Sequence, residues 1–437
     1  MFASVFQRVA SRRSKTRGRV RRKLAGRRLI MEGLELRHLL ATIVVDDDHA
    51  QCPNATEISI QDAVDAAQPG DTVQVCPGTY VEQVTIPNTK DGLVLKSTEQ
   101  FEAVIKAPAG MTEPGIVHID GADDVTISGF TITGPFTDLS GLRTGIFVGG
   151  GGSATIENNH ITAIRGAPMN GVQNGVAILV GRGSINETGT AVIDGNVIDD
   201  YQKGGIVVDN VRSSATITNN EINGAGPTTA IAQNGIQVSG GATAEISDNL
   251  VSGNNYTPDG TVAAGILLAG SGPVTVENNT VTHNERGIDA EDADDLTIVG
   301  NDVIDNASTG IFLDAVTESL IAENLLKNNG GHGIFLGDSD DNNVRGNIIE
   351  GNDGDGIHVT GSSDSNVIEN NSSFKNGGFD FYDDAVPGPG GTPNVWEDNS
   401  GKSSNRPDLA DDKHKHKKDK KDKKDKDKKD KHHKMKV

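Results

Sequence analysis

Apolar and polar residues alternate along this chain over short stretches that return at a nearly fixed interval. The typical stretch is Gly-Ile-x-Val, as in residues 205–208, which is the pattern of a short, half-buried β-strand rather than of a helix. A period this regular predicts one structural unit stacked many times. The glycines that open the stretches are 30 residues apart at first and then 22 or 23 apart: Gly115, Gly145, Gly175, Gly205, Gly235, Gly265, Gly287, Gly310, Gly333 and Gly356.

A second pattern, apolar-x-x-Asn-x-apolar, repeats in step with the first. Asparagine tolerates the left-handed backbone of a tight corner, and stacked coils would place these side chains about 4.8 Å apart, within reach of one another. We therefore predict three short strands in each coil and a structural column of asparagines at one corner. The asparagines concerned are Asn159, Asn196, Asn220, Asn249, Asn279, Asn301, Asn324, Asn347 and Asn370.

A coil of 22 or 23 residues with three strands is about the shortest that can enclose an apolar interior. The chain is therefore expected to form an all-β parallel solenoid of about 12 coils between residues 73 and 381, stable because neighbouring coils cover each other. Both ends of such a stack need a cap, since an open end exposes core and unpaired strand edges.

Residues 59–68 have the pattern of a capping helix, with Ile60, Val64 and Ala67 on one face and Ser59 at the N-cap position. The only two cysteines, Cys52 and Cys76, flank this helix. They predict a disulfide formed in an oxidising compartment, with free buried thiols or a metal site as the alternatives. At the other end, a cap rather than a ligand site is expected from the aromatic residues Phe379, Phe381, Tyr382 and Trp396.

The two termini differ from the body in charge. Residues 1–40 carry a net charge of +10 and residues 411–437 carry +7, so the total of −21 leaves −38 on the body. We predict a basic export or sorting segment over 1–42, the solenoid over 43–400, and a disordered Lys/Asp/His-rich tail over 401–437. No stretch approaches the length of a membrane span, and we expect no nucleic-acid partner.

The motif of residues 59–80, Ser-Ile-Gln-Asp-Ala-Val-Asp-Ala-Ala-Gln-Pro-Gly-Asp-Thr-Val-Gln-Val-Cys-Pro-Gly-Thr-Tyr, stands ahead of the Gly-Ile coils and their asparagines. Together they resemble the right-handed parallel β-helix repeat family of the pectate-lyase-like superfamily. That superfamily includes lyases, uronan epimerases and copper-assembly proteins, so the resemblance implies a right-handed parallel β-helix but no single activity. Residues 28–29 and 34–41 are similar to the LEPR-XLL segment of exported bacterial proteins, with Leu36 in place of the usual proline, which implies an extracytoplasmic location.

Extra residues in the longer coils predict a wall beside one sheet, and hence a cleft. They lie mainly in 133–144, 162–174, 223–234 and 252–264. Abstraction of the proton beside a uronate carboxyl needs a base and a cation that holds the enolate charge. Arg143 and Lys203 could supply these groups, with Asp209 as a ligand for a bridging Ca²⁺; the alternative is that all three are solvated loop residues.

Saccharide contacts in the same cleft are expected from cationic, amide and aromatic side chains. Four of these side chains each lie two residues before a strand glycine. In chain order they are Arg143, Gln173, Lys203 and Gln233, so cations and amides alternate. The full set of candidate substrate-binding residues is Arg165, Gln173, Tyr201, Gln233 and Tyr256.

Acidic turns in the later coils could hold Ca²⁺, which favours six to eight oxygen ligands; a solvated acidic surface is the alternative. The candidate ligands are Asp292, Asp294, Asp295, Asp338 and Asp340. No cofactor is required by the sequence, and copper handling is disfavoured because the histidines fall at scattered coil positions. The outward column of the Gly-Ile strands is largely apolar, which suits adhesion, contact between subunits or cover by a loop.

These observations predict an exported or cell-surface β-helix protein that binds polysaccharide or an envelope component without chemistry. The alternative is a Ca²⁺-assisted uronan lyase or epimerase that uses a cleft formed by residues 133–264. A purely structural rod is a third possibility. The binding hypothesis and the enzyme hypothesis differ in whether Arg143, Lys203 and Asp209 meet at one point, as the enzyme would require.

Overall fold

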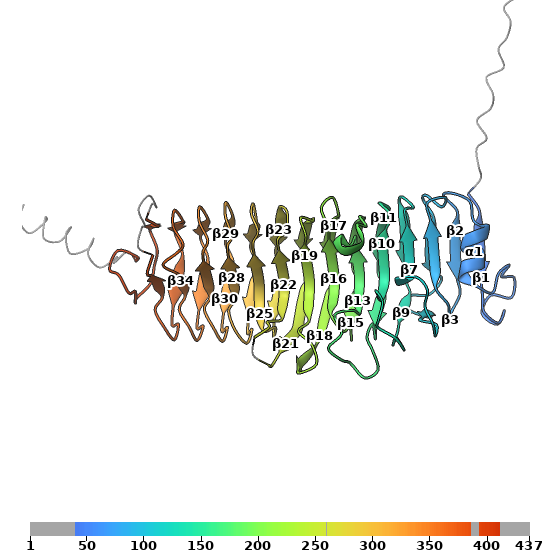
Figure 1. The fold of residues 1–437 in the computed structure, drawn as a ribbon, viewed down its shortest axis with the longest axis horizontal. Helices are drawn as coiled ribbons and strands as arrows, with labels where there is room; N and C mark the ends of the chain where they lie inside the picture. Colours follow the sequence, from blue (N-terminus) through green and yellow to red (C-terminus); the bar gives the residue numbers. More distant parts are fainter. Residues whose placement is uncertain (1–39, 259, 386–392, 411–437) are drawn as a thin grey trace, which may run out of the picture. The chain divides into compact units, whose positions relative to one another are not determined.

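The computed structural model of the protein describes residues 40–258, 260–385 and 393–410. Within them the chain winds into a stack of three-stranded coils, in which every strand pairs in parallel with its counterparts in neighbouring coils (Figure 1). This confirms the predicted parallel β-helix. The LEPR-XLL-like residues up to position 39 and the tail from 411 onward lie outside the described residues.

Three sheets run along the stack, and each coil passes from sheet 1 to sheet 3 and then to sheet 2. Sheet 1 has 14 strands: β1 (Thr42–Val45), β2 (Thr72–Val75), β5 (Val94–Ser97), β8 (Val125–Ser128), β11 (Ser153–Glu157), β14 (Thr190–Asp194), β17 (Ser214–Thr218), β20 (Thr243–Ser247), β23 (Val274–Glu277), β26 (Thr297–Val299), β29 (Leu320–Ala322), β32 (Asn343–Arg345), β35 (Val367–Glu369) and β38 (Val395–Glu397).

Sheet 2 contains the Gly-Ile strands and has 12 members: β4 (Val84–Pro87), β7 (Gly115–Asp120), β10 (Thr144–Gly149), β13 (Val176–Val180), β16 (Gly204–Asp209), β19 (Asn234–Ser239), β22 (Ala264–Ala269), β25 (Arg286–Glu291), β28 (Ile311–Asp314), β31 (Ile334–Gly337), β34 (Ile357–Val359) and β37 (Phe381–Asp383).

Sheet 3 also has 12 strands: β3 (Gly78–Val81), β6 (Ala103–Lys106), β9 (Thr131–Thr133), β12 (His160–Thr162), β15 (Val197–Asp199), β18 (Glu221–Thr228), β21 (Leu250–Tyr256), β24 (Thr280–Thr282), β27 (Asp302–Ile304), β30 (Leu325–Lys327), β33 (Ile348–Glu350) and β36 (Ser372–Phe374). Alternate residues of all three sheets point inward and form one continuous apolar core along the axis.

The register of sheet 2 corrects the predicted glycine column at two places. Opposite Gly145 lie Ile116 of β7 and Ala177 of β13, so Gly115 and Gly175 are not members of the column. In the later coils the glycines do align, because a side chain has no room there. A Cβ atom on Gly265 would lie 2.6 Å from Val281 Cγ1 and 2.7 Å from Asn284 Nδ2. Glycines that are evenly spaced by 30 residues in the first half of the chain therefore do not all lie opposite one another in sheet 2.

The predicted asparagine column is present between sheets 1 and 3, and its members are nearly fully buried. In each step the side-chain Nδ2 and the backbone N–H of one asparagine both donate to Oδ1 of the asparagine in the next coil, at 2.9–3.1 Å. The column comprises Asn159, Asn196, Asn220, Asn249, Asn279, Asn301, Asn324, Asn347, Asn371 and Asn399.

Asn371, not the predicted Asn370, continues this column, because Asn370 occupies the left-handed position immediately before it. Sequence analysis also missed a second column at the corner between sheets 3 and 2, formed by Asn254, Asn284, Asn306, Asn329, Asn352 and Asn376. A shorter third column follows the corner between sheets 2 and 1, with Asn342, Asn366 and Asn394. All three corners of the later coils are therefore held by stacked amides.

The N-terminal cap is as predicted. Helix α1 (Ile60–Ala66) begins at Ser59, whose hydroxyl accepts a hydrogen bond from the Asp62 N–H, and its apolar face is buried. Glu82 adds a cap that the sequence did not reveal, because its carboxylate accepts from the N–H groups of residues 60 and 61. Cys52 and Cys76 form the predicted disulfide.

At the C-terminal end, only two of the four predicted aromatic residues close the core. Phe381 is buried and meets the Trp396 ring edge-to-face, with ring centroids 5.7 Å apart. Phe379 and Tyr382 lie instead on the outer surface of sheet 2, where Tyr382 stacks on His358. Residues 401–410 also pack on the last coil, since Leu409 is buried.

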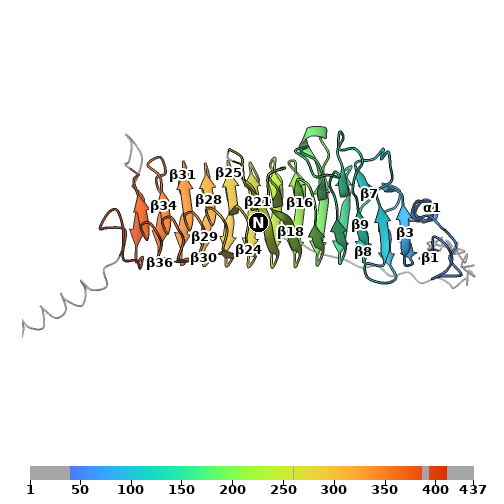
Figure 2. The same ribbon diagram turned by 90° about the horizontal axis from the view of Figure 1, so that it is seen from below.

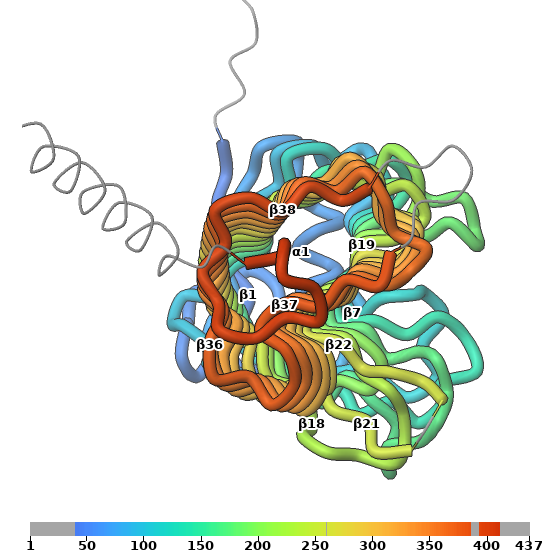
Figure 3. Tube along the Cα trace, turned by 90° about the vertical axis from the view of Figure 1, so that its left-hand side faces the viewer, coloured from blue at the N-terminus to red at the C-terminus, as the bar shows by residue number. Residues whose placement is uncertain are grey.

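Longer loops depart from the regular coil in the first half of the stack. Figure 2 shows loops of the green part of the chain projecting beyond the outline of neighbouring coils. Viewed along the axis, the loops near β18 and β21 spread well outside the orange coils of the C-terminal half (Figure 3). One loop, over residues 181–189, contains a short 3₁₀ helix, η1 (Gly183–Ile185). No helix of the described residues has the length and apolar character to cross a bilayer.

Replacing one buried asparagine should weaken the stack. Asn301→Ala would leave the Asn279 N–H and side-chain amide without their acceptor and the Val276 carbonyl without its donor. We expect a loss of about 3 kcal/mol in unfolding free energy, measured as a lower urea midpoint. Asn223→Ala is the matched control: Asn223 is half-buried on the outer face of β18, where it bonds the Glu221 and Ser252 side chains, and its loss should cost about 1 kcal/mol or less. Equal losses in both variants would contradict a stabilising column.

Candidate functional site

The three predicted catalytic residues do not meet at one point. In sheet 2, Gly175 lies between Arg143 and Lys203, and the two cations extend in opposite directions along the axis. Arg143 donates to the carbonyl of Met111 in the preceding coil, whereas Lys203 Nζ donates to the carbonyl of Ala232 in the following coil, at 2.8 Å.

Asp209 lies at the far end of strand β16 from Lys203. Six residues of extended chain separate them by about 20 Å. The Asp209 carboxylate accepts hydrogen bonds from the Gly183 N–H and from Ser239 Oγ, so it fixes the 181–189 loop to its neighbours. Lys203 is largely buried, and this burial lowers its pKa. Each group therefore has a local structural role, and the arrangement offers no shared base, cation and metal ligand.

Two of the predicted substrate-binding residues belong to the interior. Tyr201 is fully buried, and its hydroxyl donates to Asn254 Oδ1 at 2.6 Å. Gln233 is also buried and donates to the Tyr201 carbonyl. Neither side chain can contact a saccharide, which corrects the prediction: the sequence placed them in long loops, but both turn inward to support the corner.

The other three predicted binding residues remain nearer the surface but do not form a row. Arg165 pairs with Asp200, with Nε and Oδ1 2.5 Å apart. Gln173 is exposed and donates to the Gly171 carbonyl. It was predicted to lie opposite Lys203, but Gly175, two residues later in the chain, occupies that position. Tyr256 ends β21 and is half-buried.

One of the inserts predicted to form a wall, residues 133–144, packs on sheet 2 through Leu142. A separate apolar cluster lies outside the main core, on the outer surface of the sheet, and the half-buried Leu142 from an insert packs on it. His118 adds a ring that stacks on Phe147, with centroids 5.2 Å apart. The members of this cluster are Phe147, Val176, Leu179 and Val207. Cover by a loop, one of the three predicted uses of this column, is thus its use in this part of the sheet.

The acidic turns predicted to hold Ca²⁺ serve the backbone. Asp292, Asp295 and Asp338 all have positive φ, between 45° and 58°, and Asp is among the few residues other than glycine that adopt this conformation readily. Asp294 accepts from Thr317, and Asp340 accepts from the Asp364 N–H. Among the described residues, these carboxylates are not in either of the two groups that bring three ligand atoms within 4.8 Å.

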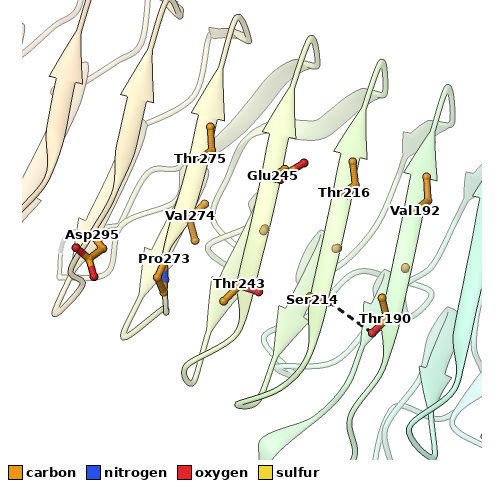
Figure 4. A pocket seen from close by; sticks show the side chains of 13 residues that line it. Thr190, Val192, Ser214, Thr216, Thr243, Glu245, Pro273, Val274, Thr275 and Asp295 are labelled. Carbon is orange, nitrogen blue, oxygen red and sulfur yellow. Dashed lines mark hydrogen bonds between the residues drawn. The ribbon is translucent and has the colours of Figure 1, made fainter.

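A shallow trough with a volume of about 450 Å³ lies on the outer surface of sheet 1. It crosses strands β14, β17, β20 and β23, which is a length of roughly 15–20 Å along the axis (Figure 4). Most of its lining residues belong to these four strands, and Pro273 and Asp295 come from the turns before β23 and β26. The lining is Thr190, Ala191, Val192, Ser214, Ala215, Thr216, Thr243, Ala244, Glu245, Pro273, Val274, Thr275 and Asp295.

Hydroxyl groups in register dominate the trough. Thr190, Ser214 and Thr243 face one another across three strands, and Ser214 Oγ donates to Thr190 Oγ1 at 3.5 Å. A second row passes from Val192 through Thr216 and Glu245 to Thr275. Hydroxyls both donate and accept, and the only charged lining groups are two carboxylates. Sequence analysis missed this site, although the outward Ser and Thr positions of the Asn-bearing strands were visible.

Two adjacent columns of side chains line the outer surface of sheet 2 beyond the covered part. They are linked within each coil by i, i+3 contacts: Asn234 bonds Gln237, Arg286 bonds Asp289, and Asp355 bonds His358. The second column continues through stacked rings, with Phe312 and Phe335 4.8 Å apart and nearly parallel. Because these rings cover each other's faces, they present edges to solvent and offer no flat platform for a sugar ring.

Asp289 is the most buried acid of these columns. Burial raises its pKa to about 6, although the neighbouring Arg286 guanidinium opposes this shift. Arg286 itself bonds both carboxylate oxygens and lies 3.6 Å from the centre of the Phe312 ring. The Asp289 carboxyl can exchange a proton near neutral pH. However, Asp289 is only 3 % exposed, and both of its carboxylate oxygens are bonded to Arg286.

Comparison with known proteins agrees with this architecture. A family model described as "Right handed beta helix region" matches residues 115–255, and one described as "Periplasmic copper-binding protein (NosD)" matches residues 228–403. The uncharacterized protein YwoF of Bacillus subtilis (strain 168) is 27 % identical over 286 residues, which cover 57 % of this chain and 58 % of that protein.

Solved structures of similar fold include three whose sequences are 13–16 % identical to this chain. They are the Dettilon tailspike protein (TM-score 0.52, 16 % identical, covering 77 % of this chain and 63 % of that one), the periplasmic alginate epimerase AlgG (0.51, 13 %, 78 % and 82 %) and XylC in complex with xylose (0.53, 14 %, 82 % and 86 %). The chain thus spans less than two thirds of YwoF and of the tailspike.

Three parallel sheets, stacked amides and a capping helix define a β-solenoid protein. The chain has the fold of a right-handed parallel β-helix, which is the region that the family model over residues 115–255 describes and the fold of the solved structures it resembles.

The titration of Asp289 should be visible in stability. Its pKa is about 6 in the folded chain against a usual 3.8, so between these pH values the folded chain binds more protons than the unfolded chain. The contribution of Asp289 to the unfolding free energy therefore falls as pH rises from 4 to 6, by at most about 3 kcal/mol. Asp289→Asn should remove this fall, measured by urea unfolding at pH 4 and 7. The exposed Asp302→Asn is the control, and a fall that persists in Asp289→Asn would contradict the assignment.

Proposed function

We propose that this protein binds a polysaccharide in the trough of sheet 1, outside the cytoplasm, and does so without chemistry. The observation that carries the proposal is the array of aligned hydroxyls on an open, elongated surface of successive strands. Polar groups that both donate and accept suit the hydroxyls of a saccharide chain, and the spacing of strands gives the trough a repeat along the direction in which such a chain would lie.

Charge narrows the class of polysaccharide. The trough has Glu245 and Asp295 in its lining and no cationic side chain among its described lining residues. The body of the chain also carries a net charge of −38. An anionic polymer would be repelled by this surface, so the ligand is an uncharged or amino-sugar polysaccharide.

The disulfide supports an extracytoplasmic location, because such bonds persist in oxidising compartments. Two proteins of similar fold also carry saccharides in their names, alginate for one and xylose for the other, and one of these is periplasmic. These likenesses concern the fold; the ligand class proposed for this chain rests on the trough.

Lyase or epimerase chemistry on a uronan is the alternative function, and the site geometry does not favour it. That chemistry needs a base and a cation at one carbon atom. Arg143 and Lys203 are directed to opposite neighbouring coils, and Asp209 lies at the other end of its strand. The trough itself holds carboxylates without a cationic partner.

A substitution that fills the trough should abolish binding. Thr216→Trp places a large ring in the middle of the hydroxyl rows, and we expect at least a tenfold weaker affinity in titration calorimetry against a panel of neutral, amino-sugar and uronic polysaccharides. Thr126→Trp is the matched control, because Thr126 is an outward residue of β8 in the same sheet but outside the trough. Binding to no member of the panel, or equal binding by both variants, would contradict the proposal.

Binding without chemistry also predicts that pectate and alginate are left intact. Incubation of the full chain with either polymer, with and without Ca²⁺, should give no rise in ultraviolet absorbance from an unsaturated product, and no change in uronate stereochemistry by NMR. A product that disappears in Lys203→Ala or Arg143→Ala would establish the alternative function instead.

A further inference from the structure

Two histidines and an aspartate converge on the outer surface of sheet 2, near its C-terminal end. His332 and Asp355 occupy the same position in consecutive coils, just before the strand glycines, and His358 lies three residues after Asp355. His358 Nδ1 is 2.7 Å from Asp355 Oδ2, and His332 Nδ1 is 3.6 Å from the same oxygen. The two imidazole centroids are 4.5 Å apart.

The histidines do occupy different coil positions, as predicted, but the fold nevertheless brings two of them together. His332 and His358 are 26 residues apart in the chain and belong to different positions of the repeat, so no spacing rule for metal ligands links them. The register of β31 and β34 brings them together, because a side chain before one strand reaches the outward side chain of the next.

The cluster has the burial of a binding site that opens to solvent. The side chains of His332, Asp355 and His358 are 29 %, 12 % and 20 % exposed, so an ion can enter while most of each group is fixed by packing. Phe335 and Tyr382 stack on either side of His358 and hold its ring in place. One possible ligand atom from each of the three residues lies within 4.8 Å of the others.

We propose that His332, Asp355 and His358 form a binding site for a divalent transition-metal ion. Two imidazoles and a carboxylate are the ligand set of many such sites, with remaining positions left to water. Two ligand atoms about 2.1 Å from one ion are about 3.4 Å apart in a tetrahedral site. The present separations of 2.7 and 3.6 Å therefore require only small side-chain rotations.

Binding gives up two existing hydrogen bonds, the first of which joins His358 Nδ1 to Asp355 Oδ2 and is lost when both of these atoms coordinate the ion. His332 Nδ1 now accepts a hydrogen bond from the Asp355 N–H at 3.0 Å, and coordination by either nitrogen of this ring gives up that bond. The net loss for such bonds is small beside the free energy of a multidentate metal site.

The ligand chemistry selects the oxidation state and the metals to test. Cu²⁺, Zn²⁺ and Ni²⁺ accept imidazole and carboxylate, whereas Cu⁺ prefers thiolate and thioether sulfur. Both cysteines are in the disulfide, and the two methionines of the described residues, Met111 and Met169, belong to coils near the other end. The matching family model is described as copper-binding, and the residues present here fit Cu²⁺ but not Cu⁺.

The described residues contain one other group of possible metal ligands within 4.8 Å of one another, formed by Asp46, Asp47 and Asp48, and its role is structural. Asp46 accepts from the Cys52 N–H and Asp47 accepts from the Thr79 N–H, so these carboxylates support the N-terminal cap. The histidine cluster therefore stands apart in chemistry from the acidic turns of the chain.

The test is titration of the full chain with Cu²⁺ and Zn²⁺ by calorimetry, followed by electron paramagnetic resonance of the Cu²⁺ form. His414, His416, His432 and His433 are first replaced by serine, because these tail residues could bind metal themselves. We expect one ion per chain, nitrogen hyperfine structure from two imidazoles, and at least a tenfold loss of affinity in His358→Ala and in His332→Gln.

His283→Ala, which removes an exposed histidine at a turn of another coil, is the matched control and should bind as the parent does. Unfolding midpoints without metal show whether each variant retains its fold. Absence of a stoichiometric ion, or equal affinity in the parent, His358→Ala and His332→Gln, would overturn the proposal. Because the trough of sheet 1 shares no residue with this cluster, loss of polysaccharide binding would leave the metal result unaffected.

Discussion

The structure depends on hydrogen bonds that satisfy the backbone N–H and carbonyl groups at the buried corners of each coil. A parallel coil must turn three times around an apolar core, and each turn leaves an N–H group and a carbonyl with no strand partner. Stacked asparagines meet this need, since each Oδ1 accepts from the backbone and the side chain of the preceding coil while Nδ2 donates to a carbonyl. The coils are therefore joined at their corners as well as along their strands.

The repeated coil was predictable from the sequence because its cause is local and periodic. Alternating apolar residues specify inward positions, and Asn at a fixed offset specifies the corner. Where two residues compete for one role, as at Asn370 and Asn371, the pattern alone chose the wrong one, because the preceding left-handed position accepts the same residue type. The second column was missed although its asparagines follow those of the first column by five residues, as Asn306 follows Asn301, so this signal was present in the sequence.

The functional surfaces were harder to predict because they depend on register between coils. A shift of two residues at Gly175 moved Gln173 out of the expected row, and burial of Tyr201 removed the proposed sugar platform. The histidine cluster joins positions from different parts of the repeat, so only the stacking of β31 on β34 reveals it. Sequence periodicity identifies side chains that stack in a single column. The histidine cluster combines two neighbouring columns, and the predicted sugar contacts depended on which loop residues turn inward.

The single disulfide gives the stack a mechanical polarity. It ties residue 52 to residue 76 across the N-terminal cap, whereas the described C-terminal coils are joined by non-covalent contacts alone. A force applied to the C-terminal end would therefore peel coils one at a time. Each coil of 23 or 24 residues would release about 80 Å of extended chain, and the residues between the two cysteines would not extend. Such a protein would act as a graded extensible element rather than as a link that fails in one step.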